Sequence, residues 1–194
     1  MFGTARPDKR GGQMNQVVTM PFDEERRVSL EDNYAITQHY YSEAHLFQTY
    51  QHREWLEKMV AQDVHYWMPV TEERFARDKR PGPKPGEMAI YDDDYDALAL
   101  RISRLETGQV WMEDPRPCLG YMVNNVEAFY SDGDMFDVRS NVSVQRNRRQ
   151  YDETRHLFFR KDQLTRKGAG FQLIRRHLWC SERVVNDKNL YFFV

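Results

Sequence analysis

Apolar residues recur at helical spacing over the first third of the chain. A helix is predicted to begin at Ser29, because Ser29 with Asp32 resembles a capping box. Its apolar stripe consists of Tyr34, Ile36, Tyr40, Tyr41, Ala44 and Phe47. A second helix is predicted over about 51–61, with its apolar face made by Trp55, Leu56, Met59 and Val60.

The middle of the chain alternates between strand, loop and helix patterns. Apolar and polar residues alternate over 64–70, which predicts a strand whose Pro69 lies near an edge or an end. Residues 71–90 hold three prolines and two glycines and are predicted to be an exposed loop. The run 92–94 (DDD) then marks the start of a third helix, since negative charge is favoured at a helix N-terminus. Its buried stripe is Leu98, Ile102 and Leu105, and Gly108 ends it.

From Pro117 onward the pattern is that of strands. Phe136, Val138, Val142 and Val144 fall on one face of a strand and polar residues fall on the other. Residues 131–134 and 167–170 are predicted hairpin turns, and the last two strands are placed at about 171–184 and 190–194. Helices that come first and a meandering antiparallel sheet that follows predict an α+β fold, with the helices on one face of the sheet.

The expected domain organisation is simple. Residues 1–28 are polar and aperiodic, so they are interpreted as a tail or an arm that orders on a partner. Residues 29–194 are interpreted as a single domain. The N-terminus lacks the apolar core of a secretory signal, and Cys118 and Cys180 are typical of a reducing compartment, so a cytoplasmic location is predicted.

Charge argues against nucleic acid as the partner. The chain has 28 basic and 30 acidic residues, so no strong electrostatic steering is expected. The basic run 145–150 (QRNRRQ) could bind phosphate, but it follows an alternating strand, which favours a solvated strand face or a salt-bridged protein interface. Aromatic residues at 13% indicate a large core, an interface or both.

The sequence offers little metal or redox chemistry. A Rieske cluster needs paired Cys and His ligands, and neither cysteine has a histidine one to three residues after it. A mononuclear iron site needs two His and a carboxylate on one face. His39, His45 and His52, with Glu43 nearby, approach that pattern, but a break in the helix is expected between His45 and His52. Histidines on a helix surface are therefore the preferred interpretation.

A pocket enzyme without a metal is the second possibility. Proton-transfer enzymes use an Asp or Tyr together with a His, and the candidates are Asp63, His65, Tyr66 and His156. Asp63 and His65 alternate with the apolar positions of their strand and are expected to point away from the core. His156 could face either way. A scaffold or surface role is favoured for all four residues.

Four blocks in order resemble the small (beta) subunits of aromatic-ring-hydroxylating dioxygenases. The first block is 41–70, where Glu43-Ala44, Trp55-Leu56, Asp63, Tyr66, Met68 and Pro69 fit that family's pattern. The second holds Arg101, Arg104-Leu105, Trp111, Glu113-Asp114-Pro115 and Asn125-Val126. The third is 137–166, with Arg146, Arg148 and 160–164, and the fourth is Asn189-Leu190 with Phe192-Phe193. The chain departs from the family after its Trp corner, at 115–121, which leaves the substrate branch open.

The resemblance carries a set of expectations. It implies a cone-shaped fold like that of nuclear transport factor 2 and scytalone dehydratase, in which a curved antiparallel sheet wraps around about three helices. It implies a partner alpha subunit that carries a 2Fe-2S Rieske cluster and a mononuclear iron, assembled as three alpha with three beta chains, the beta chains forming a trimer. A reductase, often through a ferredoxin, would supply electrons from NADH for cis-dihydroxylation of an aromatic ring. The beta chain itself would be structural, without catalytic, cofactor-binding or metal residues.

Candidate interface residues follow from this resemblance and from residue type. Arg101, Arg104, Trp111 and Asp114 are the candidates, because Trp and Arg are typical anchors of protein interfaces. Each has an intramolecular alternative: Trp111 as a core residue, and Arg104 with Asp114 as a local pair. Two other functions stay open, namely a stand-alone dehydratase or isomerase that uses Asp63 or His156, and a small-ligand binding module of the same fold.

Overall fold

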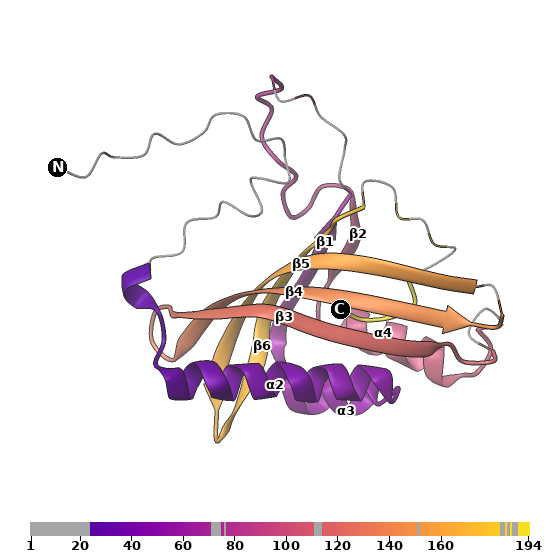
Figure 1. Ribbon diagram of the computed structural model, residues 1–194, viewed down its shortest axis with the longest axis horizontal. Coiled ribbons are helices and arrows are strands. Elements are labelled where there is room, and N and C mark those ends of the chain that lie inside the picture. The colour runs from indigo at the N-terminus through magenta and orange to yellow at the C-terminus, as the bar shows by residue number, and fades with distance from the viewer. Residues whose placement is uncertain are drawn as a thin grey trace.

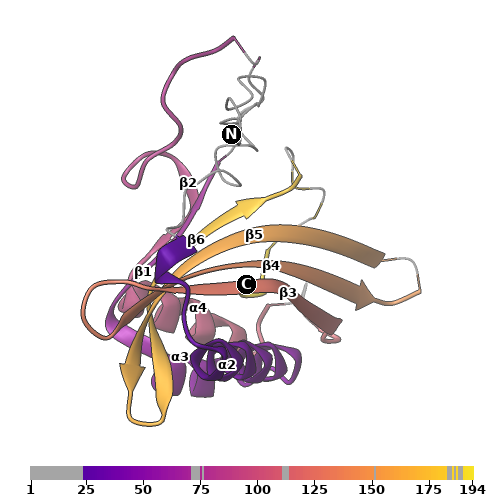
Figure 2. The same cartoon turned by 60° about the vertical axis from the view of Figure 1, so that its left-hand side comes forward.

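A computed structural model describes residues 24–70, 75, 77–110, 114–150, 152–182, 185, 187 and 190–194. In chain order the elements are η1 (Glu24–Arg26), α2 (Leu30–Gln48), α3 (His52–Met59), β1 (Val60–Pro69), β2 (Ala89–Asp93), α4 (Tyr95–Glu106), β3 (Cys118–Tyr130), β4 (Met135–Arg148), β5 (Asp152–Lys167) and β6 (Gly170–Cys180). The helices lie together on one side of a long, curved sheet (Figures 1 and 2). The predicted α+β fold is confirmed.

Within the described residues, six strands form one sheet in the order β2-β1-β6-β5-β4-β3. Every neighbouring pair is antiparallel except β1 and β6, which run parallel. The sheet is therefore mixed, which corrects the expected purely antiparallel sheet. Strands β1 and β6 can pair in parallel because they are far apart in the chain. The elements between them bring β6 back to β1 in the same direction. Pro69 lies at the end of β1, where a missing N–H disturbs the pairing least.

Helix α2 begins where the sequence predicts it. The Ser29 side chain accepts a hydrogen bond from the Asp32 N–H at 3.1 Å. The buried face is narrower than predicted, since Ile36, Tyr40, Ala44 and Phe47 are buried whereas Tyr34 and Tyr41 are 66% and 50% exposed. With 100° between successive residues, these two tyrosines fall outside the face that meets the sheet. The predicted break between His45 and His52 is confirmed, because α2 ends at Gln48 and α3 begins at His52.

Three predicted element positions are wrong. Asp92 and Asp93 do not start a helix: they end β2, and only Asp94 caps α4, accepting a hydrogen bond from the Ala97 N–H at 2.9 Å. Strand β2 exists because it pairs with β1, a contact between distant segments that local charge cannot reveal. The segment 190–194 is not a strand where the structure describes it, and the preceding strand ends at Cys180 instead of 184.

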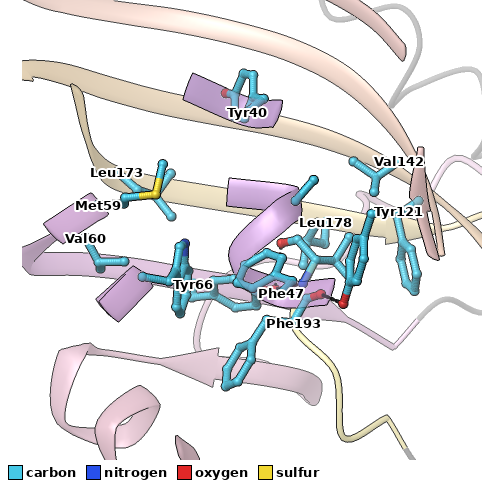
Figure 3. Close-up of a cluster of buried hydrophobic side chains, with 14 of the residues drawn as sticks. Tyr40, Phe47, Met59, Val60, Tyr66, Tyr121, Val142, Leu173, Leu178 and Phe193 are labelled. Carbon is cyan, nitrogen blue, oxygen red and sulfur yellow. Dashed lines mark hydrogen bonds between the residues drawn. The ribbon is translucent and has the colours of Figure 1, made fainter. Parts of the chain in front are cut away.

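The C-terminal segment fills the interior instead. Phe192, Phe193 and Val194 are at most 4% exposed. The Phe193 ring lies 5.2 Å from the Trp55 ring and 5.1 Å from the His52 ring, measured between centroids. The Tyr121 hydroxyl donates a hydrogen bond to the Phe193 carbonyl at 2.7 Å, drawn in Figure 3. Side chains from the helices, the sheet and the C-terminal segment thus share one core.

The segment before α2 also contacts the sheet. Arg27 forms an isolated bridge with Phe129 of β3, and the Val28 N–H donates to the Ala128 carbonyl at 3.1 Å. Residues 1–23 lie outside the described residues, so the predicted N-terminal arm stays a prediction. None of the described helices has the length and apolar character needed to cross a membrane.

Replacing Phe193 with Ala should destabilise the fold by about 3–5 kcal/mol, because it removes a buried aromatic ring from a packed cluster. The free energy of unfolding, measured by urea titration, tests this. The matched control is Tyr34→Ala, an aromatic-to-alanine change at an exposed position of α2, which should change stability by no more than about 0.5 kcal/mol. Equal stabilities of the two variants would contradict the assigned core.

Candidate functional site

Four charged side chains meet in the middle of the core. Glu43 comes from α2, Arg160 and Asp162 from β5, and Arg176 from β6, and each is at most 3% exposed. Asp162 lies directly across from Arg176 in the sheet, and Arg160 lies across from Ser140 of β4. Strand register therefore places both arginines and Asp162 on the face that α2 covers. We call these four residues the interior ion cluster.

Arg176 is the hub of the interior ion cluster. Its guanidinium donates to the Glu43 carboxylate at 2.9 and 3.1 Å and to the Asp162 carboxylate at 2.7 and 3.0 Å. Arg160 donates to Glu43 at 2.9 Å and to the Ser140 hydroxyl at 2.9 Å. Two cations and two anions balance, and ionised pairs with this many hydrogen bonds are the form in which buried charge is tolerated.

Neutral groups add further hydrogen bonds around the cluster. The Tyr40 hydroxyl donates to Asp162 at 2.9 Å, and the Trp55 indole N–H donates to Glu43 at 2.9 Å. The main-chain oxygen of Val194 accepts from Arg176 at 2.8 Å and from the Tyr66 hydroxyl at 2.9 Å. The C-terminal segment is therefore bonded directly to the charged centre of the fold.

Electrostatics keep these groups in fixed protonation states. Burial by itself would raise the pKa of Glu43, but the attraction of Arg176 and Arg160 outweighs it and lowers the pKa to about 2. Burial raises the pKa of the Tyr40 hydroxyl well above its ordinary value. Glu43 is thus ionised and Tyr40 protonated at neutral pH. Neither is suited to proton transfer there, because a general acid or base works best with a pKa near the operating pH.

The four acid–base candidates from the sequence do not converge. Asp63 is exposed, and His65 is half-buried with its Nε2 2.7 Å from an Asp92 carboxylate oxygen. Tyr66 is buried and bonded to the main chain of Val194. His156 lies on the inner face of β5, with Nδ1 3.0 Å from Glu182 and Nε2 3.2 Å from Asp187. The structure therefore does not assemble the pocket enzyme's catalytic group.

The helix histidines do not form an iron site with Glu43. His45 is exposed and His39 is half-buried on α2, whereas His52 is buried at the start of α3. Glu43 is bound by both arginines of the interior ion cluster. Burial lowers the pKa values of His39 and His52 to about 4, so both imidazoles are neutral at pH 7. The preferred interpretation as helix-surface histidines holds for His45 but is wrong for His52.

Two arginines of the basic run 145–150 face inward, contrary to the predicted solvated face, whereas Arg149 is exposed. Arg146 and Arg148 are 2% and 7% exposed. Arg146 lies 3.6 Å from the Asp187 carboxylate, and Arg148 donates to the main-chain oxygens of Asp114 and Pro115 at 2.7 and 3.2 Å. The two arginines continue the alternation of β4 onto its buried face, so they are not a surface that could bind phosphate.

The candidate interface residues lie around α4. Arg101 pairs with Asp93 at 2.6 Å and lies over the Tyr91 ring at 4.7 Å. Arg104 lies over the Tyr191 ring at 5.6 Å. Asp114 is exposed, and Trp111 lies outside the described residues.

A cleft of about 310 Å³ lies near the end of α4 and the start of α3. Its described lining is Tyr50, His52, Ile102, Leu105, Glu106, Gly108, Val110, Asp114 and Arg116. It contains Asp114 but none of the acid–base candidates Asp63, His65, Tyr66 and His156. The cleft therefore adjoins the candidate interface residue Asp114 and lies apart from the acid–base candidates chosen from the sequence.

The interior ion cluster was not predicted from the sequence, although a signal for it exists. Arg160 and Asp162 follow Phe158 and precede Leu164 at every second position of β5. All four side chains therefore share the buried face of this strand. Charged residues of opposite sign on an apolar face at spacing two indicate a buried pair. The contribution of Arg176 depends on strand register, which periodicity does not give.

One family model matches most of the chain, and solved structures share its fold. A family described as "Ring hydroxylating beta subunit" matches residues 42–187. A naphthalene 1,2-dioxygenase structure with indole bound in its active site is 26% identical, with a TM-score of 0.75, covering 93% of each chain. The beta subunit of benzoate 1,2-dioxygenase from Burkholderia mallei is 18% identical, with a TM-score of 0.67, covering 86% of this chain and 98% of that one. A putative scytalone dehydratase from Novosphingobium aromaticivorans shares the fold at 12% identity and a TM-score of 0.54, covering 79% and 86% of the two chains.

Replacing Glu43 with Gln should destabilise the protein by about 3–5 kcal/mol at pH 7, because it leaves buried arginine charge uncompensated. Since the folded-state pKa of Glu43 is about 2, against an ordinary value of 4.5, its stabilisation is present above about pH 4.5 and is lost as the pH falls toward 2. The difference in unfolding free energy between wild type and Glu43→Gln should therefore shrink over that range.

Urea titrations at several pH values measure this difference. Glu54→Gln is the control, because Glu54 pairs with Lys58 at an exposed site on α3 and the change should have an effect below about 1 kcal/mol. A Glu43→Gln effect no larger than the control would contradict a stabilising interior ion cluster.

Proposed function

The chain belongs to the ring-hydroxylating beta-subunit family, and we propose that it acts as the non-catalytic, structural subunit of a terminal oxygenase. In this role it supports the cis-dihydroxylation of an aromatic ring by a larger alpha subunit, in the breakdown of an aromatic hydrocarbon or acid. The observation that carries the proposal is the filled interior. The C-terminal segment and the interior ion cluster occupy the space where a cone-shaped fold could hold a substrate.

The filled interior also argues against the two alternatives. A dehydratase or isomerase needs an acid or base with access to substrate, and Tyr66 and His156 are buried in contacts with the protein itself. A small-ligand binding module needs a preformed apolar cavity. Around Phe47, Trp55 and Phe193 the aromatic rings pack on one another instead.

We place the iron chemistry in the alpha subunit. Cys118 and Cys180 have no histidine one to three residues after them in the sequence, as a Rieske cluster requires, and Glu43 is bound by arginines and does not serve as a metal ligand. The alpha subunit is therefore expected to hold the 2Fe-2S cluster and the mononuclear iron. We further propose a cytoplasmic assembly of three alpha and three beta chains with a beta trimer, reduced from NADH through a reductase and a ferredoxin.

We propose the outer face of α4 as part of the contact with the alpha subunit. Leu100 is 73% exposed and lies one turn before Arg104. An exposed apolar side chain beside arginines is a typical interface composition. Arg101 and Arg104 are held over the rings of Tyr91 and Tyr191, so their orientation is fixed before a partner binds. Asp114 at the adjacent cleft belongs to the described part of the proposed surface, and Trp111, outside the described residues, stays a candidate from the sequence alone.

Native mass spectrometry with iron quantification tests the proposed role on the chain purified from its own cells. We expect a complex with a larger iron-bearing chain, ring hydroxylation by that complex, and no turnover by the isolated beta chain. His156→Ala and Asp63→Asn should each leave the turnover of an assembled complex unchanged. A lone beta chain that transforms a substrate by itself, with loss in either variant, would contradict the proposal.

Leu100→Asp should reduce assembly with the alpha subunit at least tenfold, because it places a charge in the proposed apolar contact. Co-purification of tagged alpha with beta measures this. Leu30→Asp is the matched control, since Leu30 is 91% exposed on α2, away from α4. Normal assembly of Leu100→Asp would exclude this face, and a loss confined to Leu30→Asp would move the contact to α2.

A further inference from the structure

The end of β6 gathers three different metal-binding side chains beneath the C-terminal segment. His156, Cys180 and Glu182 each offer one ligand atom, and these atoms all lie within 4.8 Å of one another. We propose that His156, Cys180 and Glu182 form a binding site for a single zinc ion or a similar borderline-soft divalent cation. The site is separate from the interior ion cluster and from the proposed alpha-subunit contact.

Strand pairing brings the three residues together. Cys180 lies directly across from Phe158, so Cys180 and His156 are near neighbours on the inner face of the sheet. The Ser181 N–H donates to the Leu157 carbonyl at 2.8 Å, which carries the pairing one step beyond β6 and places Glu182 beside His156. Strand pairing thus sets the positions of His156 and Cys180, and Glu182 lies in the bend directly after β6.

The imidazole of His156 is already held in a metal-binding orientation. Nδ1 faces Glu182 at 3.0 Å, while Nε2 lies 3.2 Å from Asp187. A metal-bound histidine commonly donates its other N–H to a carboxylate, which fixes the ring and its tautomer. The Phe192 ring stacks on the imidazole, with centroids 5.8 Å apart and planes inclined by 23°, and this restricts the ring further.

The donor set selects the kind of ion. Thiolate, imidazole and carboxylate together are typical zinc ligands, whereas calcium and magnesium prefer oxygen alone. The Glu182 side chain is 28% exposed, which gives an ion a route from solvent, and His156 and Cys180 are buried behind it. Three protein ligands leave one position of a tetrahedral zinc ion for water or for a partner's side chain.

Bound zinc would clamp the β5–β6 hairpin to the segment that follows it. Because the ion binds only the folded arrangement, it should raise the unfolding temperature of the chain. This stabilisation is independent of any hydroxylase activity, so the zinc site and the proposed function can fail separately.

The test is titration of the metal-free, full-length chain with Zn²⁺, followed by calorimetry and by metal quantification after gel filtration. Cd²⁺ is titrated in parallel, because a cadmium–thiolate bond gives an ultraviolet charge-transfer band that reports on cysteine ligation. We expect one ion per chain, a cadmium–thiolate band and a zinc-dependent rise in unfolding temperature.

Variants separate this site from other zinc ligands. Cys180→Ser and Glu182→Gln should each weaken zinc binding at least tenfold, and Cys180→Ser should abolish the cadmium band. Cys118→Ser is the matched control, since Cys118 is the exposed cysteine at the start of β3, and it should bind as wild type does. Glu182→Gln, at a half-buried position, keeps the test decisive if Cys180→Ser fails to fold. Unchanged binding in the folded site variants, loss in Cys118→Ser, or no stoichiometric binding by wild type would overturn the proposal.

Discussion

The bidentate contacts of Arg176 with two buried carboxylates are the constraint on which the rest of the fold depends. Arg176 joins Glu43 of α2 to Asp162 of β5 and is itself part of β6, so one side chain links the long helix to two strands. Removing water from these charges costs several kcal/mol per ion, and good geometry with complete hydrogen bonding is needed to offset it. The helix can therefore pack on the sheet in only one position along its axis.

The same constraint fixes the end of the chain. Arg176 and the Tyr66 hydroxyl both bind the main-chain oxygen of Val194, and Tyr121 binds the carbonyl before it. These three hydrogen bonds from side chains to two main-chain oxygens hold Phe192 and Phe193 among the core aromatics. Segment 190–194 has the sequence pattern of a strand but packs inside the core. The core supplies its main chain with hydrogen bonds that a sheet edge would otherwise supply.

Local patterns were sufficient for part of this structure. The Ser29 cap, the break between α2 and α3, the two hairpin turns and the buried face of β4 follow from spacing and residue type. Strand β2, the parallel β1–β6 pair and the fate of 190–194 depend on contacts between distant segments. The interior ion cluster could be predicted only in part. The sequence shows that Arg160 and Asp162 lie at spacing two from Phe158 on one strand face. Their partners Glu43 and Arg176 are brought to them by the tertiary fold.

A filled and charge-balanced interior changes what a cone-shaped fold can do. Putative scytalone dehydratase shares the architecture, so the fold alone does not decide between a pocket and a solid core. Here the buried charges that could have served proton transfer pair with one another. The pKa of Glu43 is about 2, so its carboxylate stays charged at neutral pH. Rigidity of this kind suits a subunit that presents a fixed surface, because little conformational entropy is lost when a rigid surface binds. The proposed function therefore depends on the outer surface. There, two arginines of α4 are already held over aromatic rings and can contact a partner without reorganisation.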